Sequence, residues 1–260
     1  MPSIPIYQID AFTSALFGGN PAAICPLEAW LEDGQMQSIA AENNLPETAF
    51  FVADGDGFGL RWFTPTVEVD LCGHATLAAG WLVLDRLVPD REKVRFATRS
   101  GDLYARRDED LMVLDFPAAP GEKCAAPAAL VQGLRAEPIE TYSASYHLAI
   151  FDDEETIASL DPDMETLAAL YPSAVIASAP GDEVDFVSRF FAPGHGIPED
   201  PVTGSAHCTL TPYWSERLGR KSLRARQLSA RGGELYCEDL GARVTMGGRA
   251  VLYLEGRLYL

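Results

Sequence analysis

Hydrophobic positions along the chain predict many short strands and a few helices in each half. Short apolar or alternating runs, which are typical of strands, cover residues 4–9, 48–53, 58–64, 94–98 and 111–116 in the first half. In the second half they cover 139–150, 174–178, 184–191, 227–230, 234–238 and 250–254. Amphipathic helices are expected at 33–43, 126–134, 154–160 and 163–170.

One further helix has almost no polar face. Residues 74–84 read His-Ala-Thr-Leu-Ala-Ala-Gly-Trp-Leu-Val-Leu, and a helix that is apolar all round must be enclosed on every side. A second apolar helix is expected to begin at Gly204. Strands curling around a buried helix, seen twice, predict an α+β fold made of two pseudo-symmetric, barrel-like β domains.

Two matched blocks support a duplication of this plan. Arg-Trp-Phe-Thr-Pro (61–65) is matched by Arg-Phe-Phe-Ala-Pro (189–193), and each block is followed by a glycine that opens an apolar helix, Gly73 or Gly204. An acidic residue precedes each glycine, Asp70 in the first copy and Asp200 in the second. We therefore expect an N-terminal half at 1–117 and a C-terminal half at 118–260, with the final strand able to return to the first half.

Composition and charge narrow the possible partners. The 260 residues include 20 basic and 38 acidic side chains, a net charge of −18, which disfavours nucleic acids and anionic membranes as partners. No apolar run approaches the roughly 20 residues of a membrane span. Five cysteines without a CxxC pair favour a reduced, cytoplasmic protein. No two histidines or cysteines share ligand spacing, so no metal site is expected, and no cofactor motif is recognised.

The starts of the two apolar helices are the candidate chemical sites. The first turn of a helix leaves backbone N–H groups unpaired and carries about half a positive charge, so the amides at Gly73-His74 and Gly204-Ser205 suit a small carboxylate. His74, Asp200 and Ser205 lie at these starts, and Glu47 stands at the mouth of an apolar strand. These are acid/base and polar side chains suited to proton transfer.

Seven blocks in order resemble the PhzF family of phenazine-biosynthesis-like isomerases, within the diaminopimelate epimerase fold. They are Gly-Gly-Asn-Pro (18–21), Asn-Leu-Pro-Glu-Thr-Ala-Phe (44–50), Arg-Trp-Phe-Thr-Pro (61–65), Cys-Gly-His-Ala-Thr (72–76), Arg-Phe-Phe-Ala-Pro (189–193), Glu-Asp-Pro-Val-Thr-Gly-Ser-Ala-His (199–207) and Gln-Leu-Ser-Ala-Arg-Gly-Gly (227–233). The resemblance runs from about residue 4 to the C-terminus.

The resemblance implies a cofactor-independent isomerase that acts on a small cyclic or amino carboxylate in a cleft between the halves. It implies that Glu47 moves the proton, that His74 and Asp200 steer it, and that Gly73, His74, Gly204 and Ser205 bind the substrate. The family's founding reaction shifts a proton within the ring of a dihydro-hydroxyanthranilic acid. Family members are often homodimers, so a homodimer is expected.

The sequence departs from the family pattern at two places, and two alternative functions stay open. Pro46 stands where the family commonly has a small polar residue before the glutamate. Epimerases of this fold use one cysteine from each half; Cys72 matches the first, but residues 198–204 contain no cysteine, which disfavours a two-thiol epimerase. Amino-acid epimerisation through Glu47 opposite Asp200 or His74 stays open, as does a non-catalytic metabolite-binding protein. An acyl hydrolase is disfavoured because the GxSxG turn is missing around Ser205.

Overall fold

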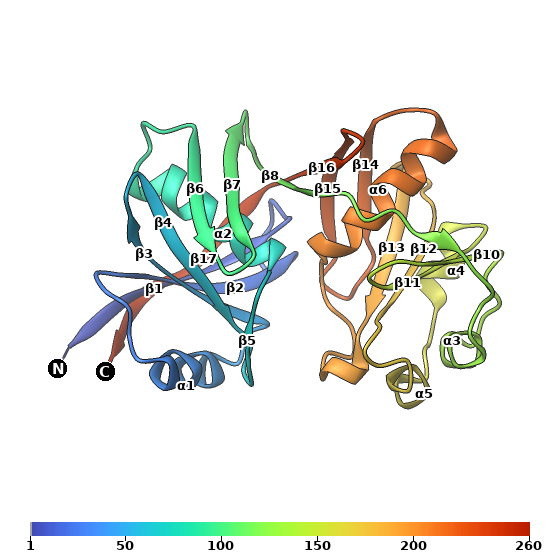
Figure 1. Cartoon of the computed structure of the whole chain (residues 1–260), viewed down its shortest axis with the longest axis horizontal. Coiled ribbons are helices and arrows are strands. Elements are labelled where there is room, and N and C mark those ends of the chain that lie inside the picture. The colour runs from blue at the N-terminus through green and yellow to red at the C-terminus, as the bar shows by residue number, and fades with distance from the viewer. Residues whose placement is uncertain (1) are drawn as a thin grey trace. The chain divides into compact units, whose positions relative to one another are not determined.

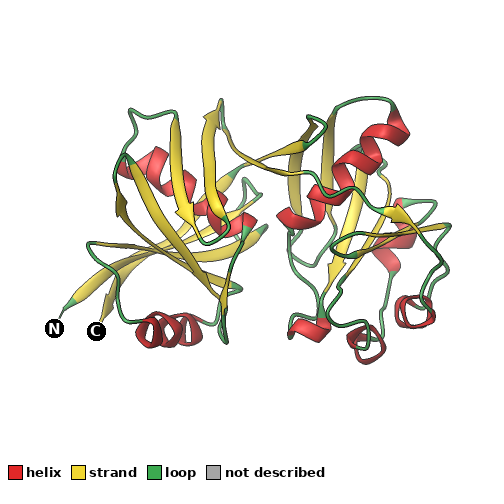
Figure 2. Ribbon diagram, in the orientation of Figure 1, coloured by secondary structure: helices red, strands yellow, loops and turns green. Residues whose placement is uncertain are grey.

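The computed structural model describes residues 2–260, which divide into two compact units. The first unit comprises the chain up to Asp115 together with Gly247–Leu260, and the second comprises Phe116–Met246. Each unit contains a central helix among strands, α2 in the first and α6 in the second (Figure 1). Figure 2 shows helices in red and strands in yellow, and both units contain several strands and a few helices.

The first unit is a curved sheet with a helix on each face. Its strands are β1 (Ser3–Ala11), β2 (Asn20–Leu27), β3 (Glu47–Asp54), β4 (Gly57–Phe63), β5 (Glu68–Val69), β6 (Lys93–Thr98), β7 (Gly101–Asp108), β8 (Leu111–Pro117) and β17 (Ala250–Tyr259). They pair in the order β17-β1-β2-β3-β4-β6-β7-β8, with β5 beside β4, and the β2/β3 and β4/β6 pairs are parallel. The chain thus returns to this unit through β17, which is antiparallel to β1.

Helix α2 (Gly73–Leu82) lies inside this curved sheet. It contacts strands β1, β2, β3, β7 and β17, and eight of its ten residues are buried. The wider turn Val83–Leu87 continues it and ends with the Val88 N–H donating to the Val83 carbonyl at 2.7 Å. The expected apolar helix is confirmed, and its enclosure on all sides follows from its lack of a polar face.

The other face of the sheet is covered by helix α1 (Asp33–Asn43). Its buried side chains Met36 and Ile39 join Phe50 and Phe63 of the sheet in one apolar cluster. The helix ends at Asn44, which adopts the left-handed conformation (φ 50°) and donates its N–H to the Ala40 carbonyl. Asparagine tolerates this conformation better than most residues, so the chain turns sharply into β3.

The second unit repeats the pairing pattern of the first. Its strands are β9 (Glu122–Lys123), β10 (Glu140–Ser143), β11 (His147–Ile150), β12 (Val175–Pro180), β13 (Phe186–Phe191), β14 (Ser222–Gln227), β15 (Gly233–Asp239) and β16 (Arg243–Gly248). From β10 to β15 the neighbouring pairs are antiparallel, parallel, antiparallel, parallel and antiparallel. The same alternation runs from β1 to β7 in the first unit, which agrees with the expected α+β fold of two pseudo-symmetric halves.

Helix α6 (Gly204–Leu218) is the central helix of the second unit. Trp214 is fully buried; its indole N–H donates to the Ser178 hydroxyl at 3.0 Å, and its ring stacks on Phe186. Shorter helices complete the unit: α3 (Ala128–Leu134), α4 (Glu154–Ser159), α5 (Met164–Ala168) and the 3-10 turn η2 (Pro193–His195). Asp153 and Asp163 accept the N–H groups of Thr156 and Thr166, which explains where α4 and α5 begin.

Several strand predictions were wrong in detail. The run 139–150 forms two strands, β10 and β11, separated by a turn, and β14 ends at Gln227 where a strand over 227–230 was expected. Strands β2, β7 and β16 were missed. Small residues dominate β2, and β7 alternates only Leu103 and Ala105 with charged or polar neighbours, so both runs carry a weak hydrophobic signal. No helix among residues 2–260 is long and apolar enough to cross a membrane.

Candidate active site

Glu47 is the first residue of β3 and follows the turn at Asn44. Its backbone pairs with Ala22 of the parallel strand β2, so its position is fixed by the sheet. The neighbouring Thr48 hydroxyl accepts a hydrogen bond from the Asn43 amide at 3.1 Å, which ties the end of α1 to the start of β3. The carboxylate is only 13% exposed, so few waters compete for it.

Cys72 and His74 stand at the beginning of α2. Cys72 is the N-cap residue with an extended backbone (φ −144°, ψ 113°), and Gly73 and His74 are the first two helical residues. Side chains two positions apart share a face where the backbone is extended, and the Cys72 Sγ accordingly lies 3.5 Å from His74 Nδ1. Both side chains are buried, at 6% and 5% exposure.

The imidazole of His74 links this thiol to the carboxylate of Glu47. His74 Nε2 lies 3.1 Å from Glu47 Oε2, on the opposite side of the ring from Cys72. The Nε2–Oε2 contact is close but poorly aligned, and neither atom has a well-directed hydrogen-bond partner among residues 2–260. Buried polar atoms are rarely left without a hydrogen-bond partner. The Glu47–His74 pair is therefore a place where a polar ligand atom would be stabilised.

Burial and neighbouring charges shift the proton affinities of the two residues at the helix start. Burial raises the pKa of the Cys72 thiol, so the protonated thiol is favoured. Burial opposes charge on His74, but Cys72 and Glu47 beside the ring outweigh it and raise the pKa of His74 well above its ordinary value. The buried imidazole beside Glu47 therefore binds a proton more readily than an ordinary histidine does.

The three side chains also bring sulfur, nitrogen and oxygen donors within 4.8 Å of one another. This corrects the expectation that no histidine and cysteine share ligand spacing, because the extended N-cap was not foreseen. The arrangement is a chain: one ring nitrogen of His74 faces Cys72 and the other faces Glu47. A zinc ion needs its ligands to converge on one point, so this chain suits proton transfer better than metal binding.

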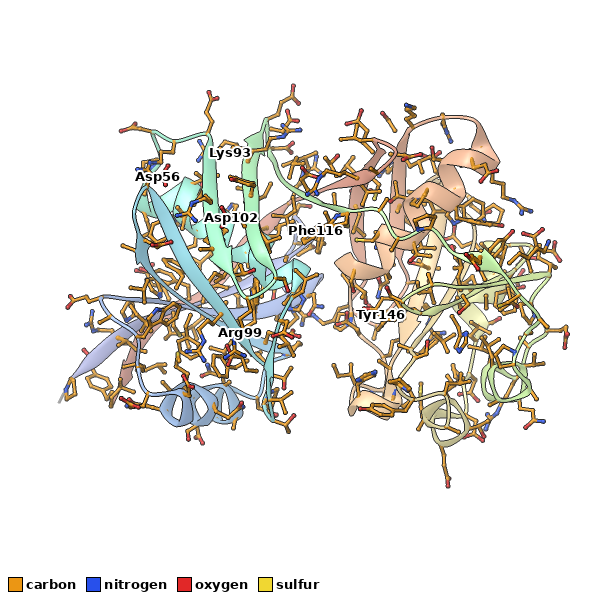
Figure 3. All side chains as sticks on the ribbon, in the orientation of Figure 1. Asp56, Lys93, Arg99, Asp102, Phe116 and Tyr146 are labelled. Carbon is orange, nitrogen blue, oxygen red and sulfur yellow. The ribbon has the colours of Figure 1, made fainter. Side chains whose placement is uncertain are left out.

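In the second unit the structure surrounds Asp200 and Ser205 with polar partners. The Thr203 hydroxyl donates to Asp200 Oδ2, and the buried Gln227 amide donates to the Asp200 carbonyl at 2.8 Å. Ser205 shares a 3.0 Å hydrogen bond with the hydroxyl of Tyr146, a residue labelled in Figure 3. Gly204 and Ser205 open α6 as expected, so Asp200 and Ser205 both lie at that helix start.

Sequence reasoning missed three of these polar residues. Thr203 and Gln227 fall inside the quoted blocks 199–207 and 227–233, and the signal that marks Gln227 is a polar side chain in a strand position facing the interior. Gln227 is fully buried and also accepts the Thr203 N–H at 2.9 Å. Tyr146 lies in the turn between β10 and β11, and nothing in the sequence marks it as a site residue.

Comparison with known proteins agrees with this fold. The family model described as phenazine biosynthesis-like protein matches residues 9–256. The protein therefore falls in the class of PhzF-type, isomerase-like proteins. The chain belongs to the phenazine biosynthesis-like (PhzC-PhzF) family.

This chain and its relatives match over nearly their whole lengths. A Pseudomonas aeruginosa protein named as an uncharacterized isomerase is 50% identical over 257 residues, 99% of each chain. The crystal structure of a PhzF-family phenazine biosynthesis protein from Enterococcus faecalis matches with a TM-score of 0.97 and 45% identity, covering 100% of both chains. A hydroxyproline epimerase from Agrobacterium vitis matches with a TM-score of 0.62 and 10% identity, over 98% of this chain and 92% of that one, which extends the shared fold to epimerases.

Proposed function

We propose that this protein is an isomerase that moves a proton between two carbons of a small carboxylic acid, with Glu47 as the group that carries the proton. Relatives named as isomerases support the general reaction class. The particular substrate and mechanism are our proposal, and the side chains of this chain suffice for it without a cofactor.

The observation that carries the proposal is the Glu47–His74 pair. A carboxylate that is 13% exposed lies 3.1 Å from a buried imidazole, and neither facing atom has an aligned partner among residues 2–260. General acid/base catalysis needs a positioned group that can accept and return a proton close to substrate. Glu47 meets that requirement because strand β3 fixes its backbone.

The proposed reaction is balanced without any other reactant. The Glu47 carboxylate removes a proton from one carbon of the substrate, and the electron pair of that C–H bond shifts along the adjacent double bond. The proton held by Glu47 exchanges with solvent, and Glu47 then delivers a proton to the carbon at the far end of the shifted double bond. His74 stabilises the carboxylate in the first step, and the first-turn amides at Gly73 and His74 suit the substrate's own carboxylate.

Conversion in heavy water tests this proposal. We would follow a dihydro-hydroxyanthranilic acid by proton NMR with the wild-type protein, Glu47→Gln and the control Glu42→Gln. Glu42 is exposed on α1 of the same unit. We expect conversion with solvent deuterium in the product for the wild type and the control. Loss of the base is expected to slow Glu47→Gln by about 10²- to 10⁴-fold.

The other outcomes separate the alternatives. Conversion by Glu47→Gln at the wild-type rate would remove Glu47 from the mechanism. If the wild type leaves this probe unchanged, the same assay with proline and other amino acids would test epimerisation, seen as deuterium at the α-carbon. Absence of exchange with both groups of probes would favour a metabolite-binding protein that keeps the family fold.

A two-thiol epimerase is not supported by the two buried cysteines of the second unit, Cys208 and Cys237. Cys208 lies in the second turn of α6, is 8% exposed and has a pKa raised to about 12 by burial. Cys237 is also buried, and burial raises its pKa to about 12. Thiols of this kind stay protonated at neutral pH and cannot act as bases.

A further inference from the structure

The contact between Cys72 and His74 has no role in the proton transfer proposed above. Cys72 is one of five cysteines, and the structure places its Sγ 3.5 Å from His74 Nδ1. This contact lies on the side of the imidazole that faces away from Glu47 Oε2. A role for Cys72 must therefore act through the orientation of the ring.

The backbone holds Cys72 firmly in this place. Its carbonyl accepts hydrogen bonds from the Thr76 N–H at 3.2 Å and from the Thr76 hydroxyl. Thr76 is itself fully buried, so neither partner is free to turn toward solvent. The backbone of Cys72 is thus held in place, and its buried thiol lies against the imidazole.

The contact favours one orientation of the ring in every protonation state. When the imidazole is neutral with its hydrogen on Nε2, Nδ1 accepts from the thiol, whereas the other tautomer would turn a bare Nε2 lone pair toward Glu47. When the imidazole is protonated, the Nδ1–H points to the sulfur, a weak acceptor, and Nε2 again carries a hydrogen. In both states an N–H faces Glu47, which is the arrangement that a carboxylate needs.

Glu47 by itself holds the ring in this orientation less firmly than Cys72 does. Its contact with Nε2 is 3.1 Å long but is not aligned as a hydrogen bond. The Cys72–His74 contact satisfies distance and angle criteria for a hydrogen bond that involves sulfur. The better-directed of the two interactions is therefore the one on the thiol side.

We propose that Cys72 is a positioning residue: its thiol engages Nδ1 of His74 and so keeps the Nε2–H edge of the ring against Glu47. This inference rests on the proposed function for its relevance to catalysis, but the orientation of the ring is measurable without any substrate. Cys72 itself touches neither the moving proton nor the substrate in this arrangement.

Side-chain NMR of the histidines tests the proposal directly. We would record ring ¹H–¹⁵N correlations across a pH series for the wild type, Cys72→Ala, Cys72→Ser and Cys25→Ala. The protein has four histidines, and the signals of His74 are assigned by their loss in His74→Gln. Cys25 is a matched control because it is a fully buried thiol on β2, packed among Ile6, Met36 and Phe50.

At a pH high enough to make the His74 ring neutral, we expect one tautomer, with hydrogen on Nε2, in the wild type and in Cys25→Ala. Cys72→Ala should show both tautomers when the ring is neutral, because the alanine offers neither a donor nor an acceptor. Cys72→Ser should restore the Nε2–H tautomer, since a hydroxyl also donates and accepts. A rescue by serine is not expected of a residue that only fills space.

Two results would overturn the proposal. One is a Cys72→Ala protein whose His74 signals and titration match the wild type. The other is a Cys25→Ala protein that changes His74 as much as Cys72→Ala does. Neither result depends on turnover, so the inference and the proposed isomerase fail separately: Glu47→Gln in the deuterium assay decides the latter.

Discussion

Arg61 of β4 and Arg189 of β13 make the same contacts in the two units. Arg61 binds both carboxylate oxygens of Glu68 at 2.7 and 2.8 Å, and Arg189 binds both of Glu199 at 2.7 and 3.0 Å. Each guanidinium also lies over the phenylalanine two residues later, 5.2 Å from Phe63 or 4.9 Å from Phe191. Two-pronged pairs of this kind fix geometry as well as charge.

These pairs locate the duplication better than the sequence pattern did. Glu68 stands five residues before Gly73, and Glu199 stands five before Gly204, so the equivalent acidic residues are Glu68 and Glu199. Sequence reasoning matched Asp70 with Asp200 instead. In each unit the arginine anchors the loop that leads into the central helix, which places the helix start relative to the sheet.

Removing the arginine of the second pair should destabilise the protein. Arg189 and Glu199 are 12% and 21% exposed, and Arg189 also donates to the carbonyls of Ile157 and Leu160. Arg189→Met leaves these acceptors unpaired, so we expect a loss of about 2–4 kcal/mol in the free energy of unfolding, measured with urea. The control Arg106→Met breaks an exposed pair with Asp108 and should cost less than about 1 kcal/mol. Equal losses would contradict the anchoring role.

Gly80 is required by the packing of α2 against β7. A Cβ at this position would lie 2.6 Å from the Cβ of Ala105, which cannot rotate away. Gly80→Ala should therefore lower the free energy of unfolding by about 1–3 kcal/mol, although alanine favours helices. Gly34→Ala in α1, where nothing lies within 4 Å, should instead raise it by up to about 1 kcal/mol. Thermal or urea unfolding of the two variants gives the comparison, and a stable Gly80→Ala protein would show that the sheet yields.

His207 should make the protein less stable in mild acid. Burial lowers its pKa to about 4, against a hydrogen bond between Nδ1 and the Thr203 carbonyl that raises it. The unfolded chain binds a proton below about pH 6.5 while the folded protein does not, so stability falls as pH drops from about 6.5 to about 4. The contribution of His207 to this fall is about 3 kcal/mol. His207→Gln should flatten the pH dependence of urea unfolding by that amount; an unchanged slope would count against a neutral His207.

His74 should act in the opposite direction. Despite burial, Cys72 and Glu47 raise its pKa well above the ordinary value. A raised pKa in the folded state stabilises the protein fully below about pH 6.5, and this stabilisation is lost as pH rises through the folded-state pKa. The free energy of unfolding of the wild type, measured with urea, should therefore fall above neutral pH relative to that of His74→Gln. Parallel curves for the two proteins would mean that folding leaves the pKa of His74 unchanged.

The fold was largely predictable because its main signals are strong. A helix apolar on every side at 74–84 must be enclosed, which leaves few possible environments. The matched blocks at 61–65 and 189–193 indicated that the same fold occurs twice. The strands β2 and β7 were missed because small or alternating charged residues give little hydrophobic contrast. Their place is decided by the helix they enclose, which is tertiary information.

The site was predictable in its residue types and less so in its contacts. Glu47 and His74 were expected to act together from the resemblance, and the structure brings them to 3.1 Å. Cys72 was noted as the match to one cysteine of the two-thiol epimerases, and its extended N-cap backbone turns its sulfur toward His74. A spacing of two residues does not reveal this contact, since it depends on where the helix begins.

The pairing of β1 with β17 has a consequence for how the chain is made. Ribosomes build proteins from the amino end, so all of Phe116–Met246 is synthesised before Ala250–Tyr259. The sheet that carries Glu47 and encloses α2 therefore stays open along the β1 edge while the second unit is already fully translated. Enclosure of α2 is therefore completed only when β17 has been made, and synthesis that stalls before β17 leaves this helix partly uncovered.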